Sequence, residues 1–179
     1  MLFTPSAFAH TLLGAHGAGF AGGVVHPFLG LDHTLAMIAV GLWAAQLGGA
    51  ELWRVPTAFV VAMAGGALLA SSSVDAAWLE AAIGGSVLGL GLLVAFAMRL
   101  PGLLGLLAVA LFATFHGYAH GLEMPQVASP VGYGLGFLVA TASLHLMGVL
   151  LGLSMGRGQS LVRAGGVAIA AAGLLLMTA

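Results

Sequence analysis

Residues 26–33 read HPFLGLDH and interrupt a stretch that is otherwise apolar. Pro27 has no amide hydrogen and Gly30 has no Cβ, so both disfavour a continuous helix. Non-helical backbone at membrane depth is tolerated only where it is buried in protein or lines a cavity. We therefore predict that His26 lies on one side of a helix break, and that Asp32 and His33 begin the next helix.

The composition is that of an integral membrane protein. The chain has 179 residues, of which 61% are hydrophobic and 5% are charged, whereas about 25% of a soluble domain is charged. The mean hydropathy is +1.14. A net charge of −1 offers no basic surface for nucleic acid. We expect residues 10–179 to form a single transmembrane helical domain within the lipid bilayer.

Hydropathy predicts an all-α, polytopic membrane helix bundle. A spanning helix needs about 20 mostly apolar residues. Six segments of the sequence qualify: 31–48, 55–73, 78–98, 102–123, 130–154 and 161–178. A further apolar stretch, 12–29, is rich in glycine and leads into the break. We therefore expect six spanning helices plus a broken or re-entrant N-terminal helix.

Arginines indicate the orientation in the membrane. They lie at alternate connections between the apolar stretches, at Arg54, Arg99, Arg157 and Arg163. The positive-inside rule places these connections in the cytoplasm and the C-terminus outside it. Residues 1–9 end with small residues at Ala7 and Ala9, as a signal-peptide cleavage site does. We expect them to be the remnant of a signal peptide, with the mature N-terminus extracytoplasmic.

A second polar stretch, residues 116–123, reads HGYAHGLE. His116, His120 and Glu123 stand at i, i+4 and i+7, so they share one face of a helix. Two imidazoles at i and i+4 are a metal-binding spacing, and the carboxylate is a third ligand, an orienting group or a proton acceptor. In the alternative interpretation, Glu123 lies in interfacial water and the histidines bond to backbone or hydroxyl groups.

The first stretch offers His26, Asp32 and His33 as ligands. Its alternative interpretation makes Asp32 a helix cap, which suits the positive N-terminus of a helix, with the histidines bonding to freed carbonyls. We rank four other candidate ligands lower, namely His10, His16, Met37 and His145. A single histidine in an apolar helix is usually a hydrogen-bonded packing residue, which is what we expect of His145.

The chemistry of these donors favours a divalent transition metal. The chain has no cysteine, so a site must use imidazole, carboxylate or other non-thiolate ligands, which suit nickel or cobalt better than copper(I). No phosphate-binding loop of the Walker type is present, and all four basic residues are arginines. We expect nickel(II) or cobalt(II) as a transported substrate, and no organic cofactor.

Both polar stretches closely resemble the two signature motifs of the HupE/UreJ family. The first motif continues through Met37 and GLWAA at residues 41–45, and the second runs from 115 to 123 as FHGYAHGLE. The resemblance covers essentially the whole chain. It implies a bacterial inner-membrane protein found with nickel-hydrogenase and urease genes and regarded as a nickel permease, with cobalt-associated relatives. The motif residues correspond here to His26, Asp32, His33, His116, His120 and Glu123.

We therefore predict an uptake permease for nickel, or for cobalt, and not an enzyme. The family implies a functional link to hydrogenase or urease maturation, and the chain is compatible with a homo-oligomer. Two alternatives stay open. One is an intramembrane zinc hydrolase in which His116 and His120 hold zinc, and the other is a metallochaperone or assembly factor for a nickel enzyme.

Overall fold

Seven α-helices make up the described part of the computed structural model, which is residues 19–70, 76–124, 129–155 and 159–178. They are α1 (Phe20–Leu29), α2 (Leu31–Leu47), α3 (Glu51–Leu68), α4 (Ala76–Ala95), α5 (Gly102–Glu123), α6 (Pro130–Ser154) and α7 (Gln159–Leu176). No strand occurs in these four ranges, so the all-α prediction is confirmed. The predicted signal remnant at 1–9, His10 and His16 lie outside the described residues.

Local sequence sets the helix ends. Gly48 and Gly49 separate α2 from α3 with φ values of 73° and 57°, which glycine adopts without a steric penalty. Pro130 is the first residue of α6, where its missing amide hydrogen costs nothing. Ser129 caps that helix, because its side chain accepts a hydrogen bond from the backbone N–H of Gly132 at 3.3 Å.

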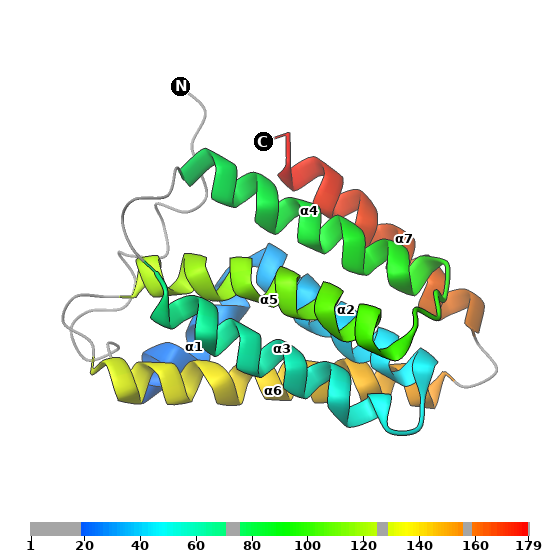
Figure 1. Cartoon of the computed structure of the whole chain (residues 1–179), viewed down its shortest axis with the longest axis horizontal. Coiled ribbons are helices and arrows are strands. Elements are labelled where there is room, and N and C mark those ends of the chain that lie inside the picture. Colours follow the sequence, from blue (N-terminus) through cyan, green and yellow to red (C-terminus); the bar gives the residue numbers. More distant parts are fainter. Residues whose placement is uncertain (1–18, 71–75, 125–128, 156–158, 179) are drawn as a thin grey trace.

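The predicted break in the N-terminal helix is confirmed at Gly30, whereas Pro27, which was also expected to interrupt the helix, lies inside α1. α1 and α2 meet at an angle of 87°, and Gly30 between them is extended, with φ −95° and ψ 120°. Thr34 Oγ1 donates a hydrogen bond to the carbonyl of Pro27 at 2.9 Å and ties the two helices across the bend. The two blue helices of Figure 1 are therefore two short elements that diverge at one residue.

The predicted number of six spanning helices is wrong. By length and composition four described helices can cross a membrane, namely α4 from Trp78, α5, α6 and α7, and the bent pair makes up to five. The predicted segment 31–48 corresponds to α2, which has only 17 residues. The segment 55–73 corresponds to α3, which begins earlier than predicted, at Glu51. Because α3 carries Glu51 and Arg54 in its first turn, its mean hydropathy is lower than that of the four helices that can cross a membrane.

Helix ends alternate between the two ends of the bundle. Helices α2, α4 and α6 end, and α3, α5 and α7 begin, at the right of Figure 1, whereas α3 and α5 end, and α4 and α6 begin, at the left. Arg54, Arg99 and Arg163 belong to the right-hand end, which we call the arginine end. The sequence pattern of alternating arginines therefore corresponds to one physical end of the molecule.

Side chains bind carbonyls at the C-terminal end of α4, and that of Met98 just after it, at the arginine end. A helix leaves its last carbonyls without partners of its own, and here α2 and α7 supply donors. The hydrogen bonds run from Trp43 Nε1 to Met98 O (2.8 Å), from Gln46 Nε2 to Val94 O (3.0 Å) and from Arg163 Nε to Ala95 O (2.8 Å). Three helices are thereby fastened together at this end.

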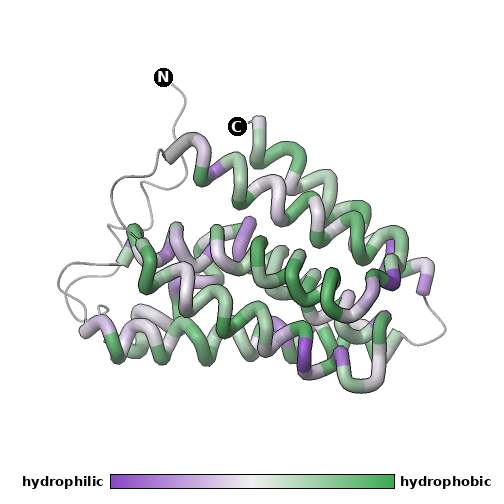
Figure 2. Tube along the Cα trace, viewed as in Figure 1, coloured by the Kyte–Doolittle hydropathy of each residue, from purple (hydrophilic) through white to green (hydrophobic). Residues whose placement is uncertain are grey.

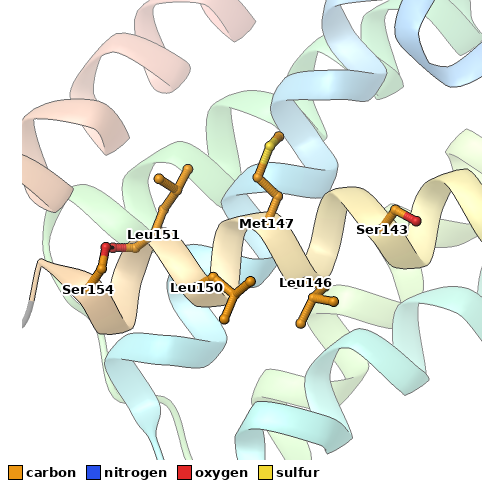
Figure 3. A pocket seen from close by; sticks show the side chains of 6 residues that line it. All are labelled: Ser143, Leu146, Met147, Leu150, Leu151 and Ser154. Atoms are coloured by element: carbon orange, nitrogen blue, oxygen red, sulfur yellow. Dashed lines mark hydrogen bonds between the residues drawn. The ribbon is translucent and has the colours of Figure 1, made fainter.

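The outer surface of the bundle is apolar. Figure 2 shows hydrophobic colouring along the outer helices, and large side chains such as Leu107, Leu135 and Leu174 are more than half exposed. A hollow of about 370 Å³ on this surface is lined by residues of α6 alone (Figure 3). Its two hydroxyls, Ser143 and Ser154, donate to carbonyls of α6 itself. The hollow therefore has the character of a lipid-facing surface.

Glycines let α3 and α5 approach closely. A Cβ added at Gly117 would meet the backbone of Met63, and one at Gly66 would meet the carbonyl of Thr114. Such small residues permit close backbone contact between helices in membranes. This contact fixes the rotation of α5 about its axis. It therefore also fixes the direction in which His116 and His120, which lie near Gly117 on that helix, point.

Replacing Gly66 by alanine is expected to lower the free energy of unfolding by about 1–3 kcal/mol, the usual cost of overpacking. Gly65→Ala is the matched control, because a Cβ there meets nothing within 4 Å. Unfolding of the purified protein in detergent, followed by circular dichroism, measures both. Equal stability of the two variants would contradict the α3–α5 contact.

Candidate metal site

The break at Gly30 positions the first set of polar side chains. His26 lies in the last turn of α1, and His33 lies in the first turn of α2 and is 2% exposed. Asp32 Oδ1 accepts the backbone N–H of His33 at 2.8 Å. The N-cap residue of α2 is Gly30, which has no side-chain cap, and Asp32 lies inside the first turn, so the interpretation of Asp32 as a helix cap is wrong. Its carboxylate binds a backbone group that the start of a helix leaves without a partner, and it also faces the His33 ring.

α5 carries the second set on one face. His116 is fully buried and His120 is nearly so, whereas the side chain of Glu123 is 45% exposed at the end of the helix. The spacing of three and four residues therefore produces a gradient from an accessible carboxylate to a buried imidazole. The interpretation of Glu123 as water-exposed is correct in part, because it is also bound to two histidines.

The two sets meet inside the bundle. His26 Nε2 lies 3.0 Å from His120 Nδ1 and 3.2 Å from Glu123 Oε2. His33 Nε2 lies 3.1 Å from His116 Nδ1 and also contacts His120 Nε2. Residues more than 80 positions apart in the sequence thus share one cluster, which we call the histidine cluster: His26, His33, His116, His120 and Glu123.

Hydrogen bonds define which nitrogen of His116 is free. Ser86 Oγ on α4 donates to the carbonyl of Ile83 at 2.7 Å, so its oxygen has only acceptor capacity left. His116 Nε2 lies 2.7 Å from that oxygen and must donate to it. The proton of a neutral His116 is therefore on Nε2, and the lone pair of Nδ1 faces His33.

Carboxylates orient the other two rings in the same way. His33 Nδ1 lies 3.6 Å from Asp32 Oδ1, and His120 Nδ1 lies 3.2 Å from Glu123 Oε2. A neutral imidazole turns its N–H toward a carboxylate, which leaves the opposite nitrogen unprotonated. The free nitrogens of His116 and His120 then both face the free nitrogen of His33, which is unfavourable unless a cation lies beside them. We call these three nitrogens the inner set.

A second group of ligand atoms lies nearer the surface. His26, His120 and Glu123 each offer one ligand atom, and these atoms all lie within 4.8 Å of one another. We call them the outer set. Since His120 Nδ1 faces the outer set and His120 Nε2 faces the inner set, one ring connects the two.

Aromatic side chains that the sequence analysis did not select surround the cluster. Phe137 on α6 lies 4.3 Å from the ring centroid of His120, and Tyr133 lies 5.8 Å from that of His26. Ser86 was also missed, although it is a buried polar residue in an apolar helix. On α4 the residues one turn before and after Ser86 are Ala82 and Leu90, which are both apolar. This pattern does not indicate a partner on α5, so the role of Ser86 is visible only in the packed structure.

Two lower-ranked candidates lie away from the cluster. Met37 is fully buried and belongs to the apolar core one turn after His33. His145 is buried on α6 and packs against the Phe59 ring at a centroid distance of 5.2 Å. No described residue forms a hydrogen bond with either of its ring nitrogens, so the expectation of a hydrogen-bonded packing residue is wrong.

Fold and site define a multi-pass helical membrane protein that holds imidazoles and carboxylates within its bundle. The sequence matches the family described as HupE / UreJ protein over residues 1–176. It is 45% identical over 173 residues to Protein HupE of Rhizobium leguminosarum bv. viciae, which covers 96% of this chain and 91% of that relative. No solved structure matches the chain.

The chain belongs to the HupE/UreJ family, a nickel/cobalt transporter-like family of membrane proteins. The resemblance seen in the two motifs is thereby confirmed. Members of the family are transporter-like, and the family name links them to nickel handling for hydrogenase and urease.

Proposed function

We propose that this protein is an uptake permease for nickel(II), or for cobalt(II), in the bacterial inner membrane. One observation carries the proposal: within the bundle His33 Nε2 lies 3.1 Å from His116 Nδ1 and contacts His120 Nε2, while Asp32, Ser86 and Glu123 face the other nitrogen of each ring. Such partners are the usual means of orienting metal-binding histidines. The donors are nitrogen and oxygen atoms, which suit these two borderline ions.

Exposure supports a direction of movement. Glu123 and His26 have exposed fractions of 45% and 20%, and His33 and His116 are buried behind them. A cation therefore reaches the outer set first and the inner set second. This end of the bundle is opposite to the arginine end (Figure 1), so the positive-inside rule makes the outer set extracytoplasmic and the movement an uptake.

His120 is the ligand that transfers the ion. When the outer set binds the ion, His120 Nδ1 is a ligand and the ring proton is on Nε2. When the inner set binds it, Nε2 is the ligand, and Nδ1–H donates to the Glu123 carboxylate. Movement of the ion from the outer to the inner set thus requires a change of tautomer in His120, in which the ring loses the proton on Nε2 and gains one on Nδ1. Imported metal would then serve maturation of a nickel enzyme, as the family association implies.

Replacing His33 or His120 by alanine is expected to lower metal uptake by at least about tenfold, since even the loss of a partner that orients a ligand costs 10–100-fold. The measurement uses purified protein in liposomes that contain a nickel-sensitive dye, with cobalt and zinc as competing ions. Leu111→Ala, on the exposed face of α5, is the control and should transport normally.

Wild-type liposomes without metal flux would contradict the permease. In that case stoichiometric zinc together with hydrolytic activity would favour the intramembrane hydrolase, and tight nickel binding without flux would favour the metallochaperone.

Replacing Ser86 by alanine is expected to weaken nickel binding by about 10–100-fold, because His116 Nε2–H loses its acceptor and the ring loses its fixed orientation. Titration calorimetry of the protein in detergent measures the affinity. Ser143→Ala removes a hydroxyl that donates to Val139 O on the outer face of α6 and should bind as the wild type does. Equal affinities for both variants would show that Ser86 does not orient the site.

A further inference from the structure

Four side chains of α6 form a row that continues past the histidine cluster. They are spaced four residues apart and therefore share one face of the helix: Tyr133, Phe137, Thr141 and His145. The first two contact cluster rings. His145 lies about 12 Å further along the helix axis than Phe137, at 1.5 Å per residue.

Thr141 and His145, the two members of this row farther from the cluster, are buried polar groups without a partner among the described residues. Thr141 and His145 are 0% and 2% exposed. Within the described ranges, no residue forms a hydrogen bond with the Thr141 hydroxyl or with either ring nitrogen of His145. Buried polar groups in proteins are nearly always paired. Among the described residues, the Thr141 oxygen and the His145 nitrogens therefore have unused capacity to bind a ligand.

Ring contacts connect His145 to the cluster. The Phe59 ring on α3 lies 5.9 Å from His116 and 5.2 Å from His145, measured between centroids. Phe59 therefore contacts a ring of the inner set as well as His145. A continuous series of contacts runs through Glu123, His120, His33, His116, Phe59 and His145.

Space and polarity continue beyond His145 toward the arginine end. Val55 lies one turn before Phe59 on α3 and lines a cavity of about 210 Å³ together with Trp43, Glu51 and Arg99. The carboxylate of Glu51 is partly exposed there and pairs with Arg54 at 3.3 Å. The far end of the bundle therefore has an open volume with a carboxylate in its wall.

We propose that His145 and Thr141 form a second, weaker metal station between the histidine cluster and this cavity. The inference rests on the proposed permease function. One imidazole nitrogen and one hydroxyl oxygen supply two ligands, and water supplies the others. Fewer protein ligands than at the cluster make binding weaker, as release at the far side requires.

His145→Leu tests the station, because leucine fills the space without a donor atom. We expect uptake into liposomes to fall by about tenfold, comparable to other losses of a metal partner. Nickel affinity at the cluster, measured by calorimetry, should stay within about threefold of the wild-type value, which is less than half the free energy of a tenfold change. His145→Gln keeps a donor oxygen and should transport faster than His145→Leu. Thr141→Val should transport more slowly than the wild type. Leu144→Met alters the packing of a neighbouring buried residue and is the control.

Each outcome bears on a different claim. Wild-type rates of uptake by His145→Leu would overturn the station and leave the permease intact, whereas absence of uptake by the wild type would overturn the permease itself. Loss of cluster affinity in His145→Leu, or equal uptake by the leucine and glutamine variants, would show that His145 only supports the fold. A similar loss of uptake in Leu144→Met would also assign the effect to packing.

Discussion

The site depends on one helix break. In a straight helix, His26 and His33 would be separated by about 10.5 Å along the axis, and the two rings could not both reach His120. The 87° bend at Gly30 turns α1 toward α6 and leaves α2 alongside the core, so His26 and His33 contact the same ring from different sides. The Thr34 hydroxyl bound to Pro27 O ties the two helices together across the bend.

A second layer of contacts gives the cluster its chemical character. Imidazoles alone would hydrogen-bond to each other in several arrangements. Ser86 fixes the proton of His116, and the two carboxylates attract the protons of His33 and His120. The lone pairs of His116 and His120 consequently face that of His33. The residues that decide this are thus a serine on α4 and two acids on α2 and α5, while the close packing of α3 on α5 through Gly66 and Gly117 sets the depth of the rings.

Periodicity and punctuation predicted a large part of this arrangement. The i, i+4 and i+7 spacing in α5 and the break between Pro27 and Asp32 are local properties, and both are present as expected. The number of spanning helices was not predictable from apolar length, because α3 begins within the charged turn at Glu51 and α2 is short. Ser86 and Phe137 could not be selected from sequence, since their roles come from contacts between distant helices. His145 was expected to be paired, and only the packed structure shows that its nitrogens lack a described partner.

The fastening of α2, α4 and α7 at the arginine end has a consequence for motion. Hydrogen bonds from Trp43, Gln46 and Arg163 join these three helices there, whereas α5 is joined to α2 through the rings of His33, His116 and His120. An ion among those rings would act as a removable clamp between α5 and the fastened helices. When the ion leaves, the contact between α5 and α2 would loosen. Binding of the ion and movement of α5 would therefore be coupled.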